Sequence, residues 1–102
     1  MAQRYQIYFE WDAAKAARNR RKHGIRFELA TTVFRDPLMI SIPDDEHSAT
    51  EERWITMGQA ENSQLLLVVH TQLDLSAQAA RVRIISARLA TKREQRQYEA
   101  EP

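Results

Sequence analysis

Apolar residues recur at every second position near the start of the chain and gather in four later stretches, and both patterns predict β-strands. Tyr5, Ile7 and Phe9 are separated by single, more polar residues, so a strand with one buried face is expected there. The later strands are expected over Leu38–Ile42, Arg53–Met57, Gln64–Thr71 and Val82–Ala87. Turn residues at positions 61–63 predict a hairpin between the second and third of these, whereas the segment LDLSAQAA (73–80) is expected to be a looser connection.

Capping signals predict where two helices begin. The Asp12 carboxylate can accept hydrogen bonds from the free N–H groups of a first turn, so a helix is expected from there to about His23. Thr91 and Glu94 have the spacing of a capping box, which predicts a last helix from about Lys92.

A middle helix is expected over Phe27–Arg35, where apolar residues recur at helical spacing. It ends before Pro37, because proline disfavours helical geometry at the residue that precedes it. Arg26, at its start, is a weak capping residue. The element order β-α-α-β-β-β-β-α predicts an α+β fold, in which a mainly antiparallel sheet carries two N-terminal helices and a C-terminal helix.

Length and composition bound the class of protein. The chain has 102 residues, 43% of them hydrophobic, which suggests one globular domain over residues 1–102. The absence of cysteine excludes thiol chemistry and disulfides. The longest apolar run, Leu65–Val69, is too short to span a membrane, and the N-terminus lacks a signal-peptide core. A cytoplasmic protein without a membrane partner is therefore expected.

Charge is segregated along the chain, although the net charge is only +1. Residues 1–23 hold six Lys/Arg against two Asp/Glu, residues 24–76 hold three against nine, and residues 77–102 hold six against three. Solvated helix faces would account for this pattern. A fold that joins the two basic ends would instead create one positive surface.

The first predicted helix concentrates cations at its end. Gly24 suits a left-handed C-terminal cap, and Lys22 and His23 would offset the helix dipole there. That role leaves the remaining cations unexplained, because most of them lie too far from the C-terminus to gain from the dipole. Five cations between Lys15 and Lys22 repel one another, so this helix favours an anionic partner.

The alternation of side chains along a strand predicts which face of the sheet each arginine occupies. Arg81 and Arg83 are expected on one face of the last strand, and the other face is expected to carry Val82, Ile84, Ser86 and then Arg88. Arg53 is expected to share a face with Ile55 and Met57. Because arginine is seldom buried without a partner, these side chains are interpreted as rim residues, ion-paired residues or the floor of an anion site.

The histidines and tryptophans have simpler interpretations. His47 follows three acidic residues, but the spacing fits no known metal loop, so no metal site and no cofactor are expected. His70, inside the longest apolar stretch, is expected to be a hydrogen-bonded core residue. Trp11 and Trp54 are expected to pack in the core or at its edge.

Several motifs, in order, resemble the BrnT family, small toxins of type II toxin–antitoxin modules. The resemblance runs from Phe9 to Glu99 and rests on FEWD (9–12), then Lys15, Asn19 and KHG (22–24), then FELATTVFRDP (27–37), DDEHSATEERW (44–54) and RVRIISARLATKREQRQYE (81–99). It implies a RelE-like fold and an endoribonuclease that acts without a metal, inhibiting translation and growth. It also implies a hetero-oligomer with a BrnA-like antitoxin, whose ribbon-helix-helix domain would contact operator DNA.

Metal-free RNA cleavage needs a base for the ribose 2′-hydroxyl, cations around the phosphate and an acid for the leaving oxygen. The hypothesis is that His23 or Glu52 transfers protons. The phosphate would be held by Lys22, Arg53, Arg83 and Arg88, and the RNA strand by Lys15, Arg18, Arg21 and Lys92. Two alternatives stay open: a binding module that grips RNA without chemistry, and a scaffold whose basic helices dock an acidic protein.

Overall fold

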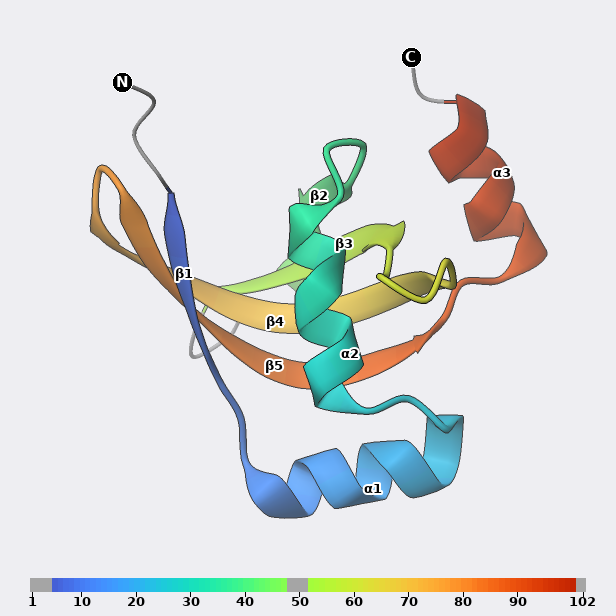
Figure 1. Ribbon diagram of the computed structural model, residues 1–102, viewed down its shortest axis with the longest axis horizontal. Coiled ribbons are helices and arrows are strands. Elements are labelled where there is room, and N and C mark those ends of the chain that lie inside the picture. Colours follow the sequence, from blue (N-terminus) through green and yellow to red (C-terminus); the bar gives the residue numbers. More distant parts are fainter. Residues whose placement is uncertain (1–4, 48–51, 101–102) are drawn as a thin grey trace.

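The computed structural model describes residues 5–47 and 52–100, and within them the chain forms one five-stranded sheet with three α-helices. The strand order is β1-β5-β4-β3-β2 (Figure 1). The strands are β1 (Gln6–Glu10), β2 (Ile40–Pro43), β3 (Arg53–Gln59), β4 (Leu65–Ser76) and β5 (Ala79–Leu89). The helices are α1 (Ala13–His23), α2 (Phe27–Thr31) and α3 (Lys92–Ala100).

The predicted order of elements and the mainly antiparallel sheet are confirmed. Only β1 pairs in parallel, with β5, and the other three pairings of the described strands are antiparallel. The helix predicted over Phe27–Arg35 is α2 followed by a 3₁₀ turn over Thr32–Arg35. As expected, Arg26 makes no side-chain capping bond, whereas the Asp12 carboxylate accepts from the Lys15 N–H at 2.9 Å.

The expectation of a loose connection over residues 73–80 is wrong. Leu73 and Leu75 continue β4, and Ala79 already begins β5, so only two residues turn between the strands. The apolar side chains at 73 and 75 alternate with polar ones at 74 and 76, which is a strand pattern. Both leucines are exposed. The pairing of the two hairpin strands, and not burial, therefore keeps this segment extended.

One face of the sheet holds the core. There α2 and the 3₁₀ turn bring Phe27, Ala30 and Val33 to full burial against Leu66 and Ile84. The helix crosses in front of the sheet in Figure 1. This close approach requires glycine in β3, because a Cβ on Gly58 would lie 2.9 Å from Val33 Cγ1.

His70 is a hydrogen-bonded core residue, as predicted. Its Nδ1 lies 3.0 Å from the Thr71 carbonyl oxygen, which can only accept, so Nδ1 carries the proton. Nε2 then accepts from the Thr56 hydroxyl at 2.7 Å, and that hydroxyl oxygen accepts from Ser41. Burial lowers the pKa of His70, which keeps the ring neutral.

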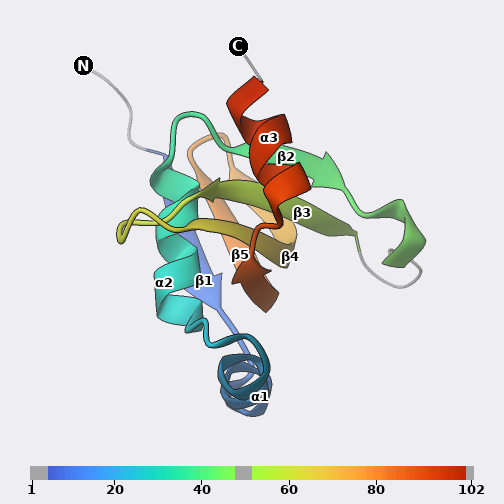
Figure 2. The ribbon, with the colours of Figure 1, turned by 90° about the vertical axis from the view of Figure 1, so that its right-hand side faces the viewer.

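The opposite face, called the open face below, carries the other side chains of the same strands, most of which are partly exposed. Two rows of paired residues run across it: Ile40, Met57, Leu67 and Arg88 form one, and Ile42, Ile55, Val69 and Ser86 form the other. Helices α1 and α2 do not lie over this face. Figure 2 shows α3 standing apart from them, beside the end of β5.

The predicted assignment of β5 side chains to the two faces of the sheet is wrong after Ile84, because the strand contains a β-bulge. The pairing with β4 shifts between Val69 and His70, so His70 pairs with Ile84 while Val69 pairs with Ser86. The extra residue, Ile85, changes which face the following side chains occupy. Ala87 therefore joins the core, and Ser86 and Arg88 lie on the open face with Arg83, not with Ile84 as alternation predicted.

Candidate functional site

The side chain of Asn19 docks α1 on the sheet. Strand β1 covers only residues 79–83 of β5, which leaves the second half of that edge without a strand. There Asn19 Oδ1 accepts from the Ala87 N–H at 3.0 Å, and Nδ2 donates to the Ala87 carbonyl at 2.9 Å. Nδ2 also donates to the Ile25 carbonyl, at 3.0 Å. One buried side chain thus replaces a strand neighbour and fixes α1 relative to β5.

A hollow of about 370 Å³ lies where α1 meets β5. Positions three and four apart share one side of a helix, so the docking of Asn19 brings its neighbours on that side to the same edge. The hollow is lined by Lys15, Arg18, Asn19, Lys22, His23, Ile85 and Ser86. Three cations and a histidine around one opening favour an anionic ligand.

Several arginines lie on the open face, which is connected to this hollow through Ser86. Ser86, which lines it, lies on the same face of β5 as Arg83 and Arg88. Arg83 pairs with Thr71, and Thr71 pairs with Arg53, so the two arginines lie about 10 Å apart at the usual spacing of strands. Lys22 follows Asn19 by one helical turn and Arg88 directly follows Ala87, so both positions are near the Asn19–Ala87 contact, but only Lys22 lines the hollow.

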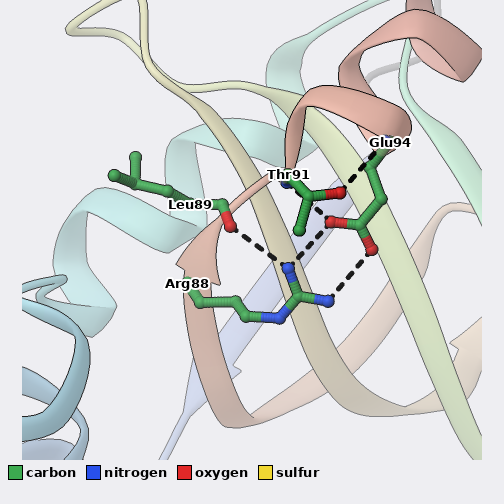
Figure 3. Close-up of polar contacts among 4 residues, drawn as sticks. All are labelled: Arg88, Leu89, Thr91 and Glu94. Atoms are coloured by element: carbon green, nitrogen blue, oxygen red, sulfur yellow. Dashed lines mark hydrogen bonds and ion pairs between the residues drawn. The ribbon is translucent and has the colours of Figure 1, made fainter.

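Arg88 is already bound to a carboxylate (Figure 3). Its Nη1 and Nη2 donate to the two oxygens of Glu94 in α3, at 2.8 and 3.0 Å, and Nη1 also donates to the Leu89 carbonyl. The bond from Arg88 holds the pKa of Glu94 down to about 2, and the same bond raises the pKa of Arg88. Sequence reasoning gave Glu94 only its capping role, which it also has, through the Thr91 N–H at 2.8 Å.

The remaining predicted residues are not gathered at the hollow. Arg21 is exposed, and two positions along a helix turn it about 200° from Asn19, away from β5. Lys92 is the first residue of α3 and is exposed. Glu52 is exposed directly before β3, a strand separated from β5 by β4. Arg20 lines a different hollow, on the α2 side of α1.

The described residues contain neither a metal-binding cluster nor a membrane-spanning helix. Within residues 5–47 and 52–100, no three His, Asp or Glu side chains gather closely enough to hold a metal ion. In the same part of the chain no helix has the length and apolar character needed to cross a membrane. The side chain of His47 lies outside the described set.

Fold and site together define a small α+β protein with a cation-lined hollow at a sheet edge. The model of a family described as "Ribonuclease toxin, BrnT, of type II toxin-antitoxin system" matches residues 11–94. The chain therefore belongs to the BrnT family and is a ribonuclease toxin of a type II toxin–antitoxin system, with RNA as substrate and an antitoxin as partner.

The structural comparison agrees with this assignment at the level of the fold. The crystal structure of the Brucella abortus ribonuclease toxin BrnT is 19% identical to the chain, with a TM-score of 0.58. The match covers 85% of this chain and 99% of the Brucella chain, and the RelE-like arrangement is consistent with it. No curated protein sequence matches the chain.

Proposed function

We propose that the chain cleaves RNA without a metal, at the hollow between α1 and β5 and on the adjoining open face. The observation that carries this proposal is the placement of Lys22 and His23 around one opening with Ser86. The bulge in β5 puts Ser86 on the same face as Arg83 and Arg88. This placement supports a common approach for the proposed proton-transfer and phosphate-binding groups. The ribose 2′-oxygen would attack the adjacent phosphorus, and the 5′-oxygen of the next nucleotide would leave.

The roles follow from the chemistry of each side chain. His23 is half-buried at the end of α1. An imidazole ring has one nitrogen that can accept a proton and one that can donate a proton, which suits a proton-transfer role. Glu52 stays the alternative for proton transfer. Lys22, Arg53, Arg83 and Arg88 would stabilise the phosphate, whose charge rises in the transition state. Lys15, Arg18, Arg21 and Lys92 would hold the strand on either side, with Arg21 and Lys92 the outermost.

The finer biological context is also proposed. Cleavage of RNA would reduce translation and stop growth, in the cytoplasm. The antitoxin would be BrnA-like, with a ribbon-helix-helix domain that carries the toxin to operator DNA. These proposals rest on membership of the BrnT family.

Substitutions of single side chains test the site. The His23→Gln and Lys22→Gln variants are expected to cleave RNA at least about 100-fold more slowly, as removal of a proton-transfer or oxyanion-stabilising group usually does. The matched control is Arg20→Gln, on the same helix but in a different hollow, and it is expected to stay within about three-fold of the parent. Cleavage of a labelled RNA is measured in excess EDTA, with circular dichroism to verify folding.

The outcomes separate the alternatives. Full activity in either folded variant would refute the role given to that residue. Activity that EDTA abolishes would refute the metal-free mechanism. Tight, salt-sensitive binding of an RNA that the parent never cuts would favour the binding module, and no affinity for RNA would favour the protein-docking scaffold.

A further inference from the structure

Two acceptors hold the guanidinium group of Arg88. Its Nη1 donates to Glu94 Oε1 at 2.8 Å and to the Leu89 carbonyl at 3.2 Å, and its Nη2 donates to Glu94 Oε2 at 3.0 Å (Figure 3). The N–H donors of a guanidinium group lie in one rigid plane, so these bonds fix the orientation of the whole group. The side chain of Arg88 is still 37% exposed, so the group remains accessible to a ligand on the open face.

The donors that these bonds leave unused form a second fork. Within residues 5–47 and 52–100, Nε of Arg88 and the second N–H of Nη2 have no hydrogen-bond partner. These two N–H groups lie on one edge of the planar group and point in nearly the same direction, which suits two oxygens of a phosphate. Arg88 therefore uses one fork for Glu94 and keeps the other available to an anionic ligand.

The carboxylate of Glu94 is also held by its own helix. Oε1 accepts from the Thr91 N–H at 2.8 Å, and Thr91 Oγ1 accepts from the Glu94 N–H at 3.1 Å. The bond from Arg88, with those from Thr91, holds the pKa of Glu94 down to about 2, so the carboxylate is ionised at physiological pH. The first turn of α3 thus orients Glu94, and Glu94 in turn orients Arg88.

A second attachment fixes α3 one turn further along. The Tyr98 hydroxyl donates to Asp36 Oδ2, and the Asp36 carboxylate also accepts from the N–H groups of Leu38 and Gln59, at 2.9 and 2.8 Å. The bond to Asp36 raises the pKa of Tyr98 to about 12, so the hydroxyl keeps its proton at physiological pH. Because α3 contributes no buried residue, these polar contacts largely determine where Glu94 lies.

We propose that Glu94 is a positioning residue for RNA cleavage, which turns Arg88 so that Nε and the unused N–H of Nη2 meet two oxygens of the phosphate. Glu94 does not touch the RNA in this arrangement, because it acts through Arg88. A donor that is already oriented stabilises the transition state without reorganising during the reaction. This inference rests on the proposed function for the role of Arg88. The opposite view, that Glu94 only competes with phosphate for Arg88, predicts an effect of the opposite sign.

The Glu94→Gln variant tests the proposal. Its amide oxygen can still accept from the Thr91 N–H, but its NH₂ group cannot accept from Arg88, so the fork is lost and the helix cap is kept. The kcat for cleavage of a labelled RNA is expected to fall about 10-fold, with KM within about three-fold of the parent, as for a contact made in the transition state. The matched control, Glu99→Gln, makes the same charge change at an exposed position of α3 and is expected to keep the parental kcat.

A double-mutant cycle separates positioning from a general loss of stability. The Arg88→Gln variant is expected to lower kcat about 100-fold, as removal of an oxyanion-stabilising group does. Adding Glu94→Gln to it should lower kcat no further, because Glu94 acts only through Arg88. Effects that multiply in the double variant would show that Glu94 acts independently of Arg88 and would overturn the proposal.

Circular dichroism at the assay temperature verifies that each variant is folded. Glu94→Asp is the second variant if Glu94→Gln does not fold. It keeps a negative charge in the first turn of α3, which favours the helix, but it is one methylene too short to reach both Nη atoms from the same backbone position. The same fall in kcat, of about 10-fold, is expected for it.

The outcomes distinguish this proposal from the proposed function. Parental or raised kcat in folded Glu94→Gln, with Arg88→Gln impaired, overturns the positioning role and leaves the proposed cleavage site standing. A raised kcat would show in addition that Glu94 masks Arg88. Parental kcat in Arg88→Gln would refute the role that the proposed function gives to Arg88, and this inference with it.

Discussion

Asn19 makes the position of α1 depend on one side chain. It is 6% exposed, and its amide group satisfies one N–H and two carbonyl groups of the backbone. Alanine at this position would leave all three groups without that partner, in a place where water enters poorly. A lost hydrogen bond of this kind costs more than it contributed, because the desolvated partners remain.

Asn19→Ala is therefore expected to lower the free energy of unfolding by about 3 kcal/mol, measured by urea denaturation. Arg20→Ala, at the next position, is exposed and is expected to change it by less than about 0.5 kcal/mol. If Asn19→Ala were as stable as Arg20→Ala, the amide would not be what holds the helix to β5.

Protonation of Glu94 at acid pH is expected to lower the free energy of unfolding. Its pKa is about 2 in the folded protein against an ordinary 4.5, because Arg88 binds the ionised form. A lowered pKa contributes stability that is fully present above pH 4.5 and is lost as the pH falls through 2. Partial exposure of the pair screens it, so the contribution is about 1–2 kcal/mol.

The Glu94→Gln variant keeps a capping-box residue but loses the charge. We expect it to be less stable than the parent by about 1–2 kcal/mol at pH 7, and the difference to shrink toward zero near pH 2. Unfolding curves of both proteins across this range provide the measurement. A difference that stays constant with pH would show that the pair contributes packing and not charge.

At the scale of elements, the sequence correctly predicted the helix ends, because contacts within one turn determine them. The cap at Asp12, the glycine end at Gly24 and the Thr91–Glu94 box each involve residues within one turn, and each is present. Gly24 has the expected left-handed backbone, with φ of 73°. The order of helices and strands followed from these ends, because little else interrupts a chain so poor in glycine and proline.

The faces of β5 could not be predicted in the same way. A two-residue period is correct up to Ile84, and then one extra residue shifts everything after it. Nothing in the run of residues 84–88 marks the bulge, since it arises from the register with β4. The docking of Asn19 on Ala87 was likewise invisible, because it joins residues 68 positions apart. The candidate site depends on both of these non-local contacts.

At the scale of the whole molecule, the fold brings together the two basic ends of the sequence. Helix α1 belongs to the segment with six cations against two acids, and β5 to the segment with six against three. Asn19 of α1 contacts Ala87 of β5, so the cations of α1 lie beside the strand that carries Arg83 and Arg88. The sequence pattern had left this arrangement open as the alternative to solvated helix faces. The end of α1 therefore has both roles: Gly24 stops the helix, and the last turn carries Lys22 and His23 into the hollow.

The proposed surface predicts how RNA binding depends on salt. Each phosphate contact releases condensed counterions, so the logarithm of the affinity falls with the logarithm of salt by about 0.7 per contact for single strands. Removing two contacts, in a Lys15→Gln/Lys22→Gln variant, should make that slope shallower by about 1.4.

The Arg20→Gln/Arg26→Gln variant loses the same charge from the other hollow and should keep the parental slope. Titrations use an RNA fully methylated at its 2′-oxygens, which cannot be cut. Equal slopes in the two double variants would mean that RNA responds to net charge alone and does not recognise the face where α1 meets β5.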